Sequence, residues 1–201
     1  FADDSGFGHH GACSGDACPT AGVGGRYGQG VQFDGSDDWI EGPDFDIGDG
    51  FTIGLWVNPD TVADQQAFIA KHTVGGDNVI VFGFYIGGYS FHLRSSYHDE
   101  GTKTVGWQHL VAVGRKTDSA QTEVGVYKDG QLLWQSTLNA VVGDAAGKGW
   151  AIGQEWDPSG MSDFFGGAMD EVVIYNRALS ELEVAALYQS NYQSRVSTSQ
   201  G

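Results

Sequence analysis

The chain has 201 residues, of which 12% are aromatic and 32 are glycine, and it carries 26 acidic against 10 basic side chains. The formal net charge of −16 argues against nucleic acid and anionic membrane surfaces as partners, because both require a basic face. The plainest role of this charge is solubility in an extracellular or saline medium; the alternative is that some carboxylates bind Ca²⁺, which prefers oxygen ligands. The length fits a single domain, and many glycines with little helical periodicity favour a β-sandwich with tight turns.

Residues 1–28 have no sustained hydrophobic period, and we expect an ordered loop region that other elements hold in place. They contain both cysteines of the chain, Cys13 and Cys18, which enclose a four-residue loop. A local disulfide is favoured; a zinc site, the alternative, would need two further ligands from elsewhere. A disulfide implies an oxidising compartment. Because the chain begins at Phe1 without Met, we expect a mature or excised part of a larger protein with neighbouring domains.

The middle of the chain alternates short apolar segments with turn residues, which is the pattern of β-strands. In FTIGLWV (51–57) the large apolar residues occupy every second position, and YSFHLRSS (89–96) has one apolar and one polar face. The longest apolar run, 79–88, is too short to span a bilayer, so we expect no membrane insertion. The predicted strands lie in 31–35, 38–42, 51–57, 67–72, 79–87, 89–96, 107–114 and 150–155, and in a hairpin over 123–138.

Residues 169–175 are predicted to form the last strand, which runs into the only convincing helix. Ser180 is placed as the N-cap residue and Glu183 completes a capping box, with Leu179 and Val184 as the hydrophobic staple. We therefore expect a short helix over 181–189 and a tail over 190–201.

Asp170 is the unusual residue of the last strand, because strict alternation places it on the same face as Val172 and Ile174. A carboxylate in such surroundings must be hydrogen-bonded, paired with a cation or bound to a metal. The residues alone leave these three states open.

The segment GGAMDEVVIYNRALSELEVAALYQS (166–190) resembles the end of laminin-G-like domains of the concanavalin A-like jelly-roll superfamily. Further stretches match that family in the same order: DDSGFGHHG at 3–11, the segment 28–59, and GWQHLVAVGRK with VYKDGQLL. The matches run from residue 3 to residue 187, so the resemblance covers nearly the whole chain. It implies an all-β fold: a two-sheet antiparallel jelly-roll β-sandwich, one domain over 1–201, with one short C-terminal helix.

The resemblance also implies a structural Ca²⁺ that ties the N-terminal loop to the last strand. Matched motif to motif, it places Asp170 with Asp3 and with the carbonyl groups of Gly6 and Gly8. Phe7 departs from the Asn usual in that loop, which removes one oxygen ligand or turn-capping amide. A glycine-rich loop suits Ca²⁺, which takes about 6–8 oxygen ligands, and a bound ion would offset the entropy of ordering this segment. The alternative is that Asp170 only accepts hydrogen bonds from backbone N–H groups.

Two loop clusters are candidate ligand-binding sites, because loops carry function on such folds and aromatic rings stack on the apolar faces of sugars. Trp56 and Trp107 lie within predicted strands, where burial in the core explains them. The two clusters are Trp156, Asp157 and Asp163, and Tyr97, His98 and Asp99.

No catalytic motif is found in the sequence. Related jelly rolls that hydrolyse glycosides carry acidic residues on alternate positions of one strand, and the nearest such string, 41–46, is broken by Pro43. The predicted function is a non-catalytic recognition or adhesion module of a secreted or cell-surface multidomain protein, with a glycan or extracellular protein as ligand. The alternatives are a carbohydrate-binding domain attached to a polysaccharide-active enzyme and a structural spacer domain.

Overall fold

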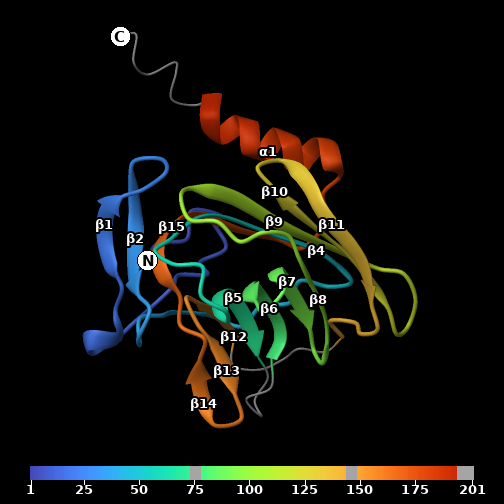
Figure 1. Cartoon of the computed structure of the whole chain (residues 1–201), viewed down its shortest axis with the longest axis horizontal. Helices are drawn as coiled ribbons and strands as arrows, with labels where there is room; N and C mark the ends of the chain where they lie inside the picture. Colours follow the sequence, from blue (N-terminus) through green and yellow to red (C-terminus); the bar gives the residue numbers. More distant parts are fainter. Residues whose placement is uncertain (73–77, 144–148, 194–201) are drawn as a thin grey trace.

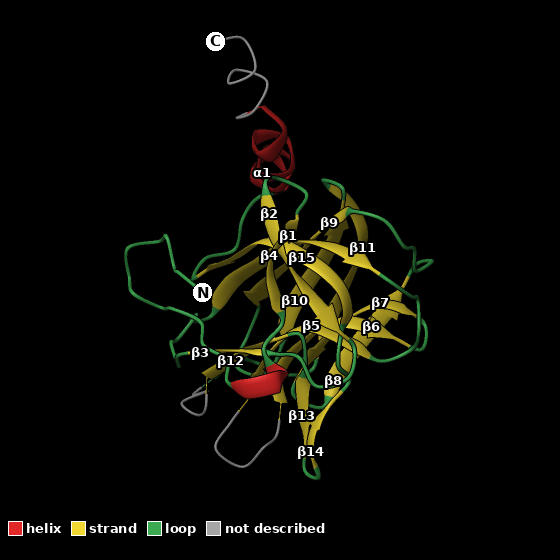
Figure 2. Ribbon diagram, turned by 90° about the vertical axis from the view of Figure 1, so that its left-hand side faces the viewer, coloured by secondary structure: helices red, strands yellow, loops and turns green. Residues whose placement is uncertain are grey.

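The computed structural model describes residues 1–72, 78–143 and 149–193, and its strands form two stacked antiparallel sheets (Figures 1 and 2). The seven-stranded sheet contains, in order, β1 (Thr20–Gly24), β2 (Gln29–Asp34), β15 (Gly166–Tyr175), β4 (Gly50–Pro59), β9 (Gln108–Lys116), β10 (Thr122–Lys128) and β11 (Gln131–Leu138). The six-stranded sheet contains β3 (Ile40–Gly42), β12 (Gly149–Ile152), β5 (Gln66–His72), β6 (Asn78–Tyr85), β7 (Gly88–Leu93) and β8 (Ser96–Glu100). The predicted two-sheet jelly-roll sandwich is therefore confirmed.

Three short elements complete the fold: a 3₁₀ turn, η1 (Gly15–Ala17), a hairpin of β13 (Glu155–Asp157) and β14 (Gly160–Ser162), and one helix, α1 (Glu181–Gln193). The hairpin projects from the end of the six-stranded sheet, whereas α1 lies at the opposite end of the molecule (Figure 1). Within the described residues no helix is long and apolar enough to cross a membrane.

The core fills the space between the two sheets with the apolar side chains that alternate along the strands. Phe51 of β4 stacks on Phe91 of β7 across this space, with ring centroids 5.5 Å apart. Phe165, just before β15, meets Phe68 of β5 edge-on at 5.3 Å. The alternation predicted for 51–57 is confirmed, because every second residue of that segment belongs to the core. Burial of these large side chains is the main stabilising contribution.

A bulge in β15 changes the predicted face of Asp170. The register of β15 against β4 shifts between Asp170 and Val173, and Glu171 has a φ of 50°. The extra residue interrupts the two-residue alternation, so Val172 and Ile174 pack against the core while Asp170 lies outside it and accepts a hydrogen bond from Tyr27. The expectation that Asp170 shares a face with these two residues is therefore wrong.

Helix α1 covers the outer face of the seven-stranded sheet (Figures 1 and 2). Leu179 and Val184, the predicted staple, are buried in a second apolar cluster with residues of β9 and β10. The predicted capping box is present, because Glu183 accepts a hydrogen bond from the Ser180 N–H and the Ser180 hydroxyl accepts one from the Glu183 N–H. The helix is one turn longer than predicted: it ends at Gln193, and residues 194–201 of the expected tail lie outside the described residues.

The N-terminal segment is less irregular than predicted. The disulfide between Cys13 and Cys18 is present, and Ala12 forms an antiparallel bridge to Glu41 in β3. Residues 20–24, expected to be loop, form β1 and pair with β2. Their sequence, TAGVG, has too few large side chains for a strand pattern, so only the neighbouring strand makes this segment extended.

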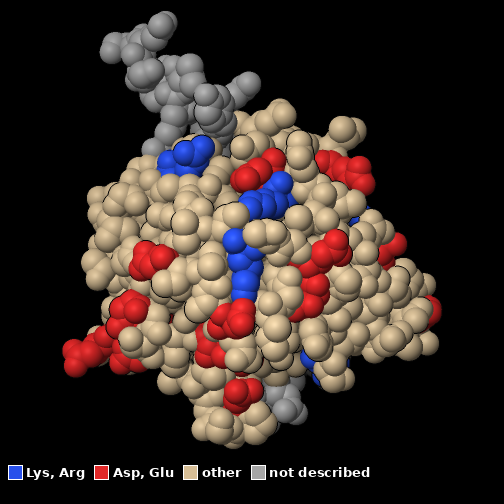
Figure 3. Space-filling view, in the orientation of Figure 1, with Lys and Arg blue, Asp and Glu red and all other residues tan. Residues whose placement is uncertain are grey.

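The net negative charge is visible on the surface. On the face shown in Figure 3, acidic side chains are spread widely, and Lys and Arg form a short central band. Long-range electrostatics therefore disfavour anionic partners on this side of the molecule.

The Thr52 hydroxyl links the seven-stranded sheet to the turn before α1. It donates a hydrogen bond to the Arg177 carbonyl (2.9 Å) and accepts one from the buried Leu179 N–H (3.0 Å). We predict that Thr52→Val lowers the free energy of unfolding by about 1–3 kcal/mol, because both groups lose a partner that a methyl group cannot replace. Urea denaturation measures the effect against Thr137→Val, which changes an exposed threonine of β11. Equal losses in the two variants would contradict this role.

Candidate functional site

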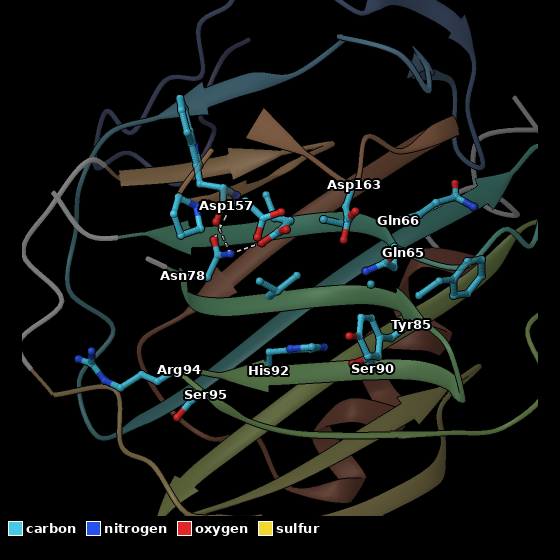
Figure 4. Close-up of a pocket in the computed structure, with 17 residues that line it drawn as sticks. Gln65, Gln66, Asn78, Tyr85, Ser90, His92, Arg94, Ser95, Asp157 and Asp163 are labelled. Atoms are coloured by element: carbon cyan, nitrogen blue, oxygen red, sulfur yellow. Dashed lines mark hydrogen bonds between the residues drawn. The ribbon is translucent and has the colours of Figure 1, made fainter. Parts of the chain in front are cut away.

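A cavity of about 560 Å³ lies on the outer face of the six-stranded sheet, beside the β13–β14 hairpin (Figure 4). Its position follows from alternation in β6, where Ile80, Phe82 and Phe84 point into the core. The intervening residues, Val81, Gly83 and Tyr85, line the cavity. The alternation that places every second side chain of β6 in the core therefore also determines which side chains line the cavity.

The floor of the cavity continues on β7. Ser90 and His92 line the cavity and alternate with the core residues Tyr89, Phe91 and Leu93. Ser90 is only 1% exposed, and its hydroxyl has no hydrogen-bond partner among the described residues. An unsatisfied buried hydroxyl costs free energy, which a hydrogen bond from a ligand or an ordered water molecule in the cavity would offset.

The hairpin supplies one wall of the cavity. The side chains of Glu155 and Asp157 lie on the same face of β13, and the Ser162 hydroxyl of β14 lies 2.9 Å from one carboxylate and 3.1 Å from the other. Asn78, at the start of β6, donates to the Glu155 carboxylate and to the Trp156 carbonyl. The Asn78 bonds fix the hairpin to the sheet, and the Ser162 hydroxyl holds the two carboxylates together at the cavity.

Asp163 is a half-buried carboxylate in the cavity, and it forms no hydrogen bond or ion pair through its side chain within the described part of the chain. Burial raises the pKa of Asp163, and the nearby charge of Asp157 adds to this shift. Burial also raises the pKa of Glu155; the hydrogen bond from Ser162 opposes that shift, while the charges of Asp163 and Asp157 reinforce it. The charges of the three carboxylates therefore disfavour one another. Because the Asp163 side chain has no partner in the described part of the chain, it is available to a ligand.

Aromatic rings form the opposite side. The His92 ring stacks on Tyr97 of β8, with centroids 4.7 Å apart and planes 11° from parallel. Tyr85 meets both rings edge-on, at 5.0 Å and 5.3 Å. Burial lowers the pKa of His92 to about 4, although the charge of Asp99 opposes the shift. The imidazole is therefore neutral at pH 7 and able both to donate and to accept hydrogen bonds.

Backbone strain is concentrated around this cavity. Gln65, Arg94 and Asp163 all line it, and their φ angles are 60°, 53° and 51°. Each left-handed non-glycine residue costs on the order of 1 kcal/mol, and such residues cluster at ligand-binding sites. Arg94 lies in the two-residue turn of the β7–β8 hairpin, which itself requires a positive φ, so Gln65 and Asp163 are the two strained positions that point to a functional region.

The structure brings together part of each predicted ligand cluster. Asp157 and Asp163 line the cavity, and Tyr97 reaches it through its contacts with Tyr85 and His92. Asp99 lies on the same side of β8, where its carboxylate accepts a hydrogen bond from the Gly87 N–H.

The aromatic rings of two residues from the predicted ligand clusters point away from the cavity. Trp156 lines the cavity, but its ring packs edge-on against Trp39 at 6.1 Å and at a tilt of 46° against His72 at 5.2 Å. The His98 ring lies on the other face of β8, against Trp134 at 4.8 Å.

Five residues that line the cavity were not predicted as ligand-binding: Glu155, Asn78, Ser90, His92 and Tyr85. The spacing Glu155-x-Asp157 was an available sign, because residues two apart on a strand share a face. Ser90 and His92 were recognised as a polar strand face, but their proximity to Asp163 depends on how distant segments pair.

The four predicted Ca²⁺ ligands lie at two places. Both carboxylate oxygens of Asp3 accept hydrogen bonds from Ser5 and His9 within the N-terminal loop, which lowers its pKa to about 2. That loop, with Gly6 and Gly8, adjoins β3, where Ala12 forms its bridge.

Asp170 instead accepts the Tyr27 N–H (2.7 Å) beside the β1–β2 turn. Across the described residues no hydrogen bond joins Asp170 to Asp3 or to the loop that carries it, and a Ca²⁺ shared by the four residues stays a prediction. Three other carboxylates, Asp34, Asp37 and Asp38, lie within 4.8 Å of one another, but backbone N–H groups of the same turn already bind two of them.

Comparison with known families and structures agrees with this architecture. Residues 34–185 match a laminin G family model described as the concanavalin A-like lectin/glucanases superfamily. No curated protein sequence matches the chain significantly.

Similar solved structures come from bacterial binding domains. Domain 4 of AbnA, a GH43 extracellular arabinanase from Geobacillus stearothermophilus in complex with arabinotriose, is 22% identical with a TM-score of 0.69 over 85% of this chain and 81% of that domain. The receptor-binding domain of botulinum neurotoxin type G is 14% identical (TM-score 0.65, 94% of this chain and 48% of that one). The binding domain of Paraclostridial Mosquitocidal Protein 1 is 16% identical (0.65, 95% and 49%). This chain thus spans about half the length of the two toxin domains.

The pKa of His92 predicts a pH-dependent stability. Between pH 6.5 and about 4 the unfolded state takes up a proton that the folded state does not, so the free energy of unfolding falls as the pH falls through this window. We predict that His92→Gln removes about 2 kcal/mol of the loss between pH 7 and pH 4.5. Urea titrations at both pH values test this, with His98→Gln on the opposite strand face as control. A pH dependence that His92→Gln leaves unchanged would contradict the burial of a neutral imidazole.

Proposed function

Because the chain belongs to the concanavalin A-like lectin/glucanases superfamily, we propose that it is a non-catalytic binding module that takes a glycan in the cavity beside the β13–β14 hairpin. The observation that carries this proposal is the set of unpaired polar groups in the cavity. The Ser90 hydroxyl is buried and unsatisfied, and the Asp163 carboxylate is half-buried without a partner in the described part of the chain.

The chemistry of these groups suits sugar hydroxyls. A carboxylate accepts hydrogen bonds from two hydroxyl groups, while the Ser90 hydroxyl and the neutral His92 ring both donate and accept. Tyr85 and Tyr97 offer aromatic surface for the apolar face of a sugar ring. A concave site with a few convergent polar groups beside aromatic rings is the usual form of a small-ligand site. The similar arabinanase domain was solved in complex with arabinotriose, which supports a glycan as the ligand of this chain.

One feature supports binding without catalysis. The Glu155 carboxylate accepts hydrogen bonds from Asn78 and Ser162, and the Ser162 hydroxyl also lies 3.1 Å from Asp157, so both carboxylates have structural roles in the hairpin. We expect no release of reducing sugar from any polysaccharide that binds.

A second candidate ligand is a protein or glycolipid receptor, as the names of the toxin receptor-binding domains suggest for those proteins. Receptor binding is an adhesion function, and the exposed Tyr97 and Met161 near the cavity would take part in such a contact. In either case we propose a secreted or cell-surface location within a larger protein, supported by the Cys13–Cys18 disulfide, which persists in oxidising compartments.

Isothermal titration calorimetry against arabinotriose, xylotetraose, cellotetraose and lactose tests the glycan proposal. We predict that Asp163→Asn weakens the best binder about tenfold or more, because a charged acceptor of sugar hydroxyls is lost. Asn tolerates the left-handed backbone of position 163, so the fold is retained. His98→Ala, on the opposite face of β8, is the matched control and should bind as the wild type. Equal weakening by both variants, or binding by neither the variants nor the wild type, would contradict the proposed site.

We also propose that the protein binds a Ca²⁺ ion, which stabilises the folded state and takes no part in ligand chemistry. If Ca²⁺ binds at Asp170, it stabilises the folded state by about 2.7 kcal/mol at a hundredfold excess over its dissociation constant. EDTA is then expected to lower the melting temperature, and Asp170→Ala to abolish the response to added Ca²⁺. An unchanged melting curve with EDTA, in protein shown by elemental analysis to be metal-free, would leave Asp170 only as an acceptor for the N–H groups of Tyr27 and Glu171.

A further inference from the structure

The cavity combines three neighbouring carboxylates with very little positive charge. Glu155, Asp157 and Asp163 line its hairpin side, and Asp99 lies by the aromatic side, where its charge acts on His92. The ion pairs of the described residues involve other acidic groups: Asp44, Asp49, Asp64, Glu100 and Glu183. No lysine or arginine therefore neutralises the cavity carboxylates in this part of the chain.

Among the described residues Arg94 is the one Lys or Arg that lines the cavity, and its guanidinium group is turned away from the carboxylates (Figure 4). It donates hydrogen bonds to the carbonyl groups of Val141 (3.1 Å) and Val142 (2.7 Å). The nearby Lys103 binds the Tyr85 carbonyl and pairs with Asp64. Both cations are thus engaged in holding loops, and an anionic ligand would meet a negative wall.

We propose, on the basis of the proposed glycan-binding function, that the cavity accepts uncharged oligosaccharides and rejects anionic ones, with Asp157 and Asp163 as the residues that determine this specificity. A neutral sugar offers hydroxyl hydrogens that these carboxylates accept. A uronate or sialate would bring a third negative charge to the place of those hydroxyl groups. One like charge at about 4 Å from a carboxylate in a partly buried site weakens binding by roughly a thousandfold. The net charge of −16 adds a long-range repulsion in the same direction.

The specificity is tested with pairs of ligands that differ in charge on one skeleton: the methyl ester of 3′-sialyllactose with its free acid, and the methyl ester of trigalacturonate with its free acid. For a pair whose neutral member binds, the wild-type ratio of dissociation constants, acidic over neutral, is expected to be about a hundred or more. In Asp157→Asn/Asp163→Asn the ratio should fall at least tenfold. A ratio within one protein is insensitive to a partly unfolded fraction, so a loss of fold does not imitate this result.

Salt provides a second measurement on the wild type alone. Raising NaCl from about 0.02 M to 0.5 M shortens the screening length several-fold, so binding of the acidic member should strengthen while that of the neutral member stays constant. If the wild type binds the acidic members as well as the neutral ones, the specificity proposal is overturned and the glycan site stands. If it binds none of these sugars or those of the wider panel, the proposed function fails and the specificity proposal fails with it.

Discussion

The structure depends on the two-residue alternation of strands β6 and β7, because both of their faces are in use. One face contributes Phe82, Phe84 and Phe91 to the core, where they pack against residues of the facing sheet. The other face presents Ser90 and His92 to the cavity. A shift of one residue in register would exchange the two sets and bury polar groups in the core. The packing free energy of the core therefore fixes the positions of the ligand-facing side chains.

The hairpin turns this polar strand face into a cavity, and it does so at an energetic cost. Glu155 is largely buried, and burial disfavours its charged form. Asn78 and Ser162 compensate through hydrogen bonds, and those of Asn78 also attach the hairpin to the sheet. Asp163 has no such compensation, and it occupies a strained backbone conformation. Natural proteins keep unfavourable features of this kind where function requires them, which is why the ligand site is assigned here rather than to the disulfide loop or the outer face under α1.

The sequence predicted those parts of the fold that depend on local patterns. Alternation in 51–57, the capping box at Ser180 and the closely spaced cysteines each depend on residues near one another in the chain, and each is confirmed. The face of Asp170 was wrong because a bulge in β15 depends on pairing with β4.

The candidate site was predicted only in part for the same reason. Asp157 and Asp163 were predicted from their place beside Trp156 in a loop, but the Trp156 ring turns toward Trp39 and His72, which the local sequence does not specify. Ser90 and Glu155 meet at one cavity only because β7 and the hairpin adjoin the same part of the sheet. Such proximity depends on topology, which single residues and their spacing do not encode.

The central claim is that a glycan occupies the cavity on the outer face of the six-stranded sheet. Mapping of backbone amide shifts by ¹⁵N–¹H NMR, during titration with arabinotriose or the best neutral binder of the panel, tests it most directly. The account predicts that the largest changes cluster at Ser90, His92, Asp163 and the residues of the β13–β14 hairpin. Saturable changes confined to the N-terminal loop or to the strands under α1, with these amides unmoved, would contradict it.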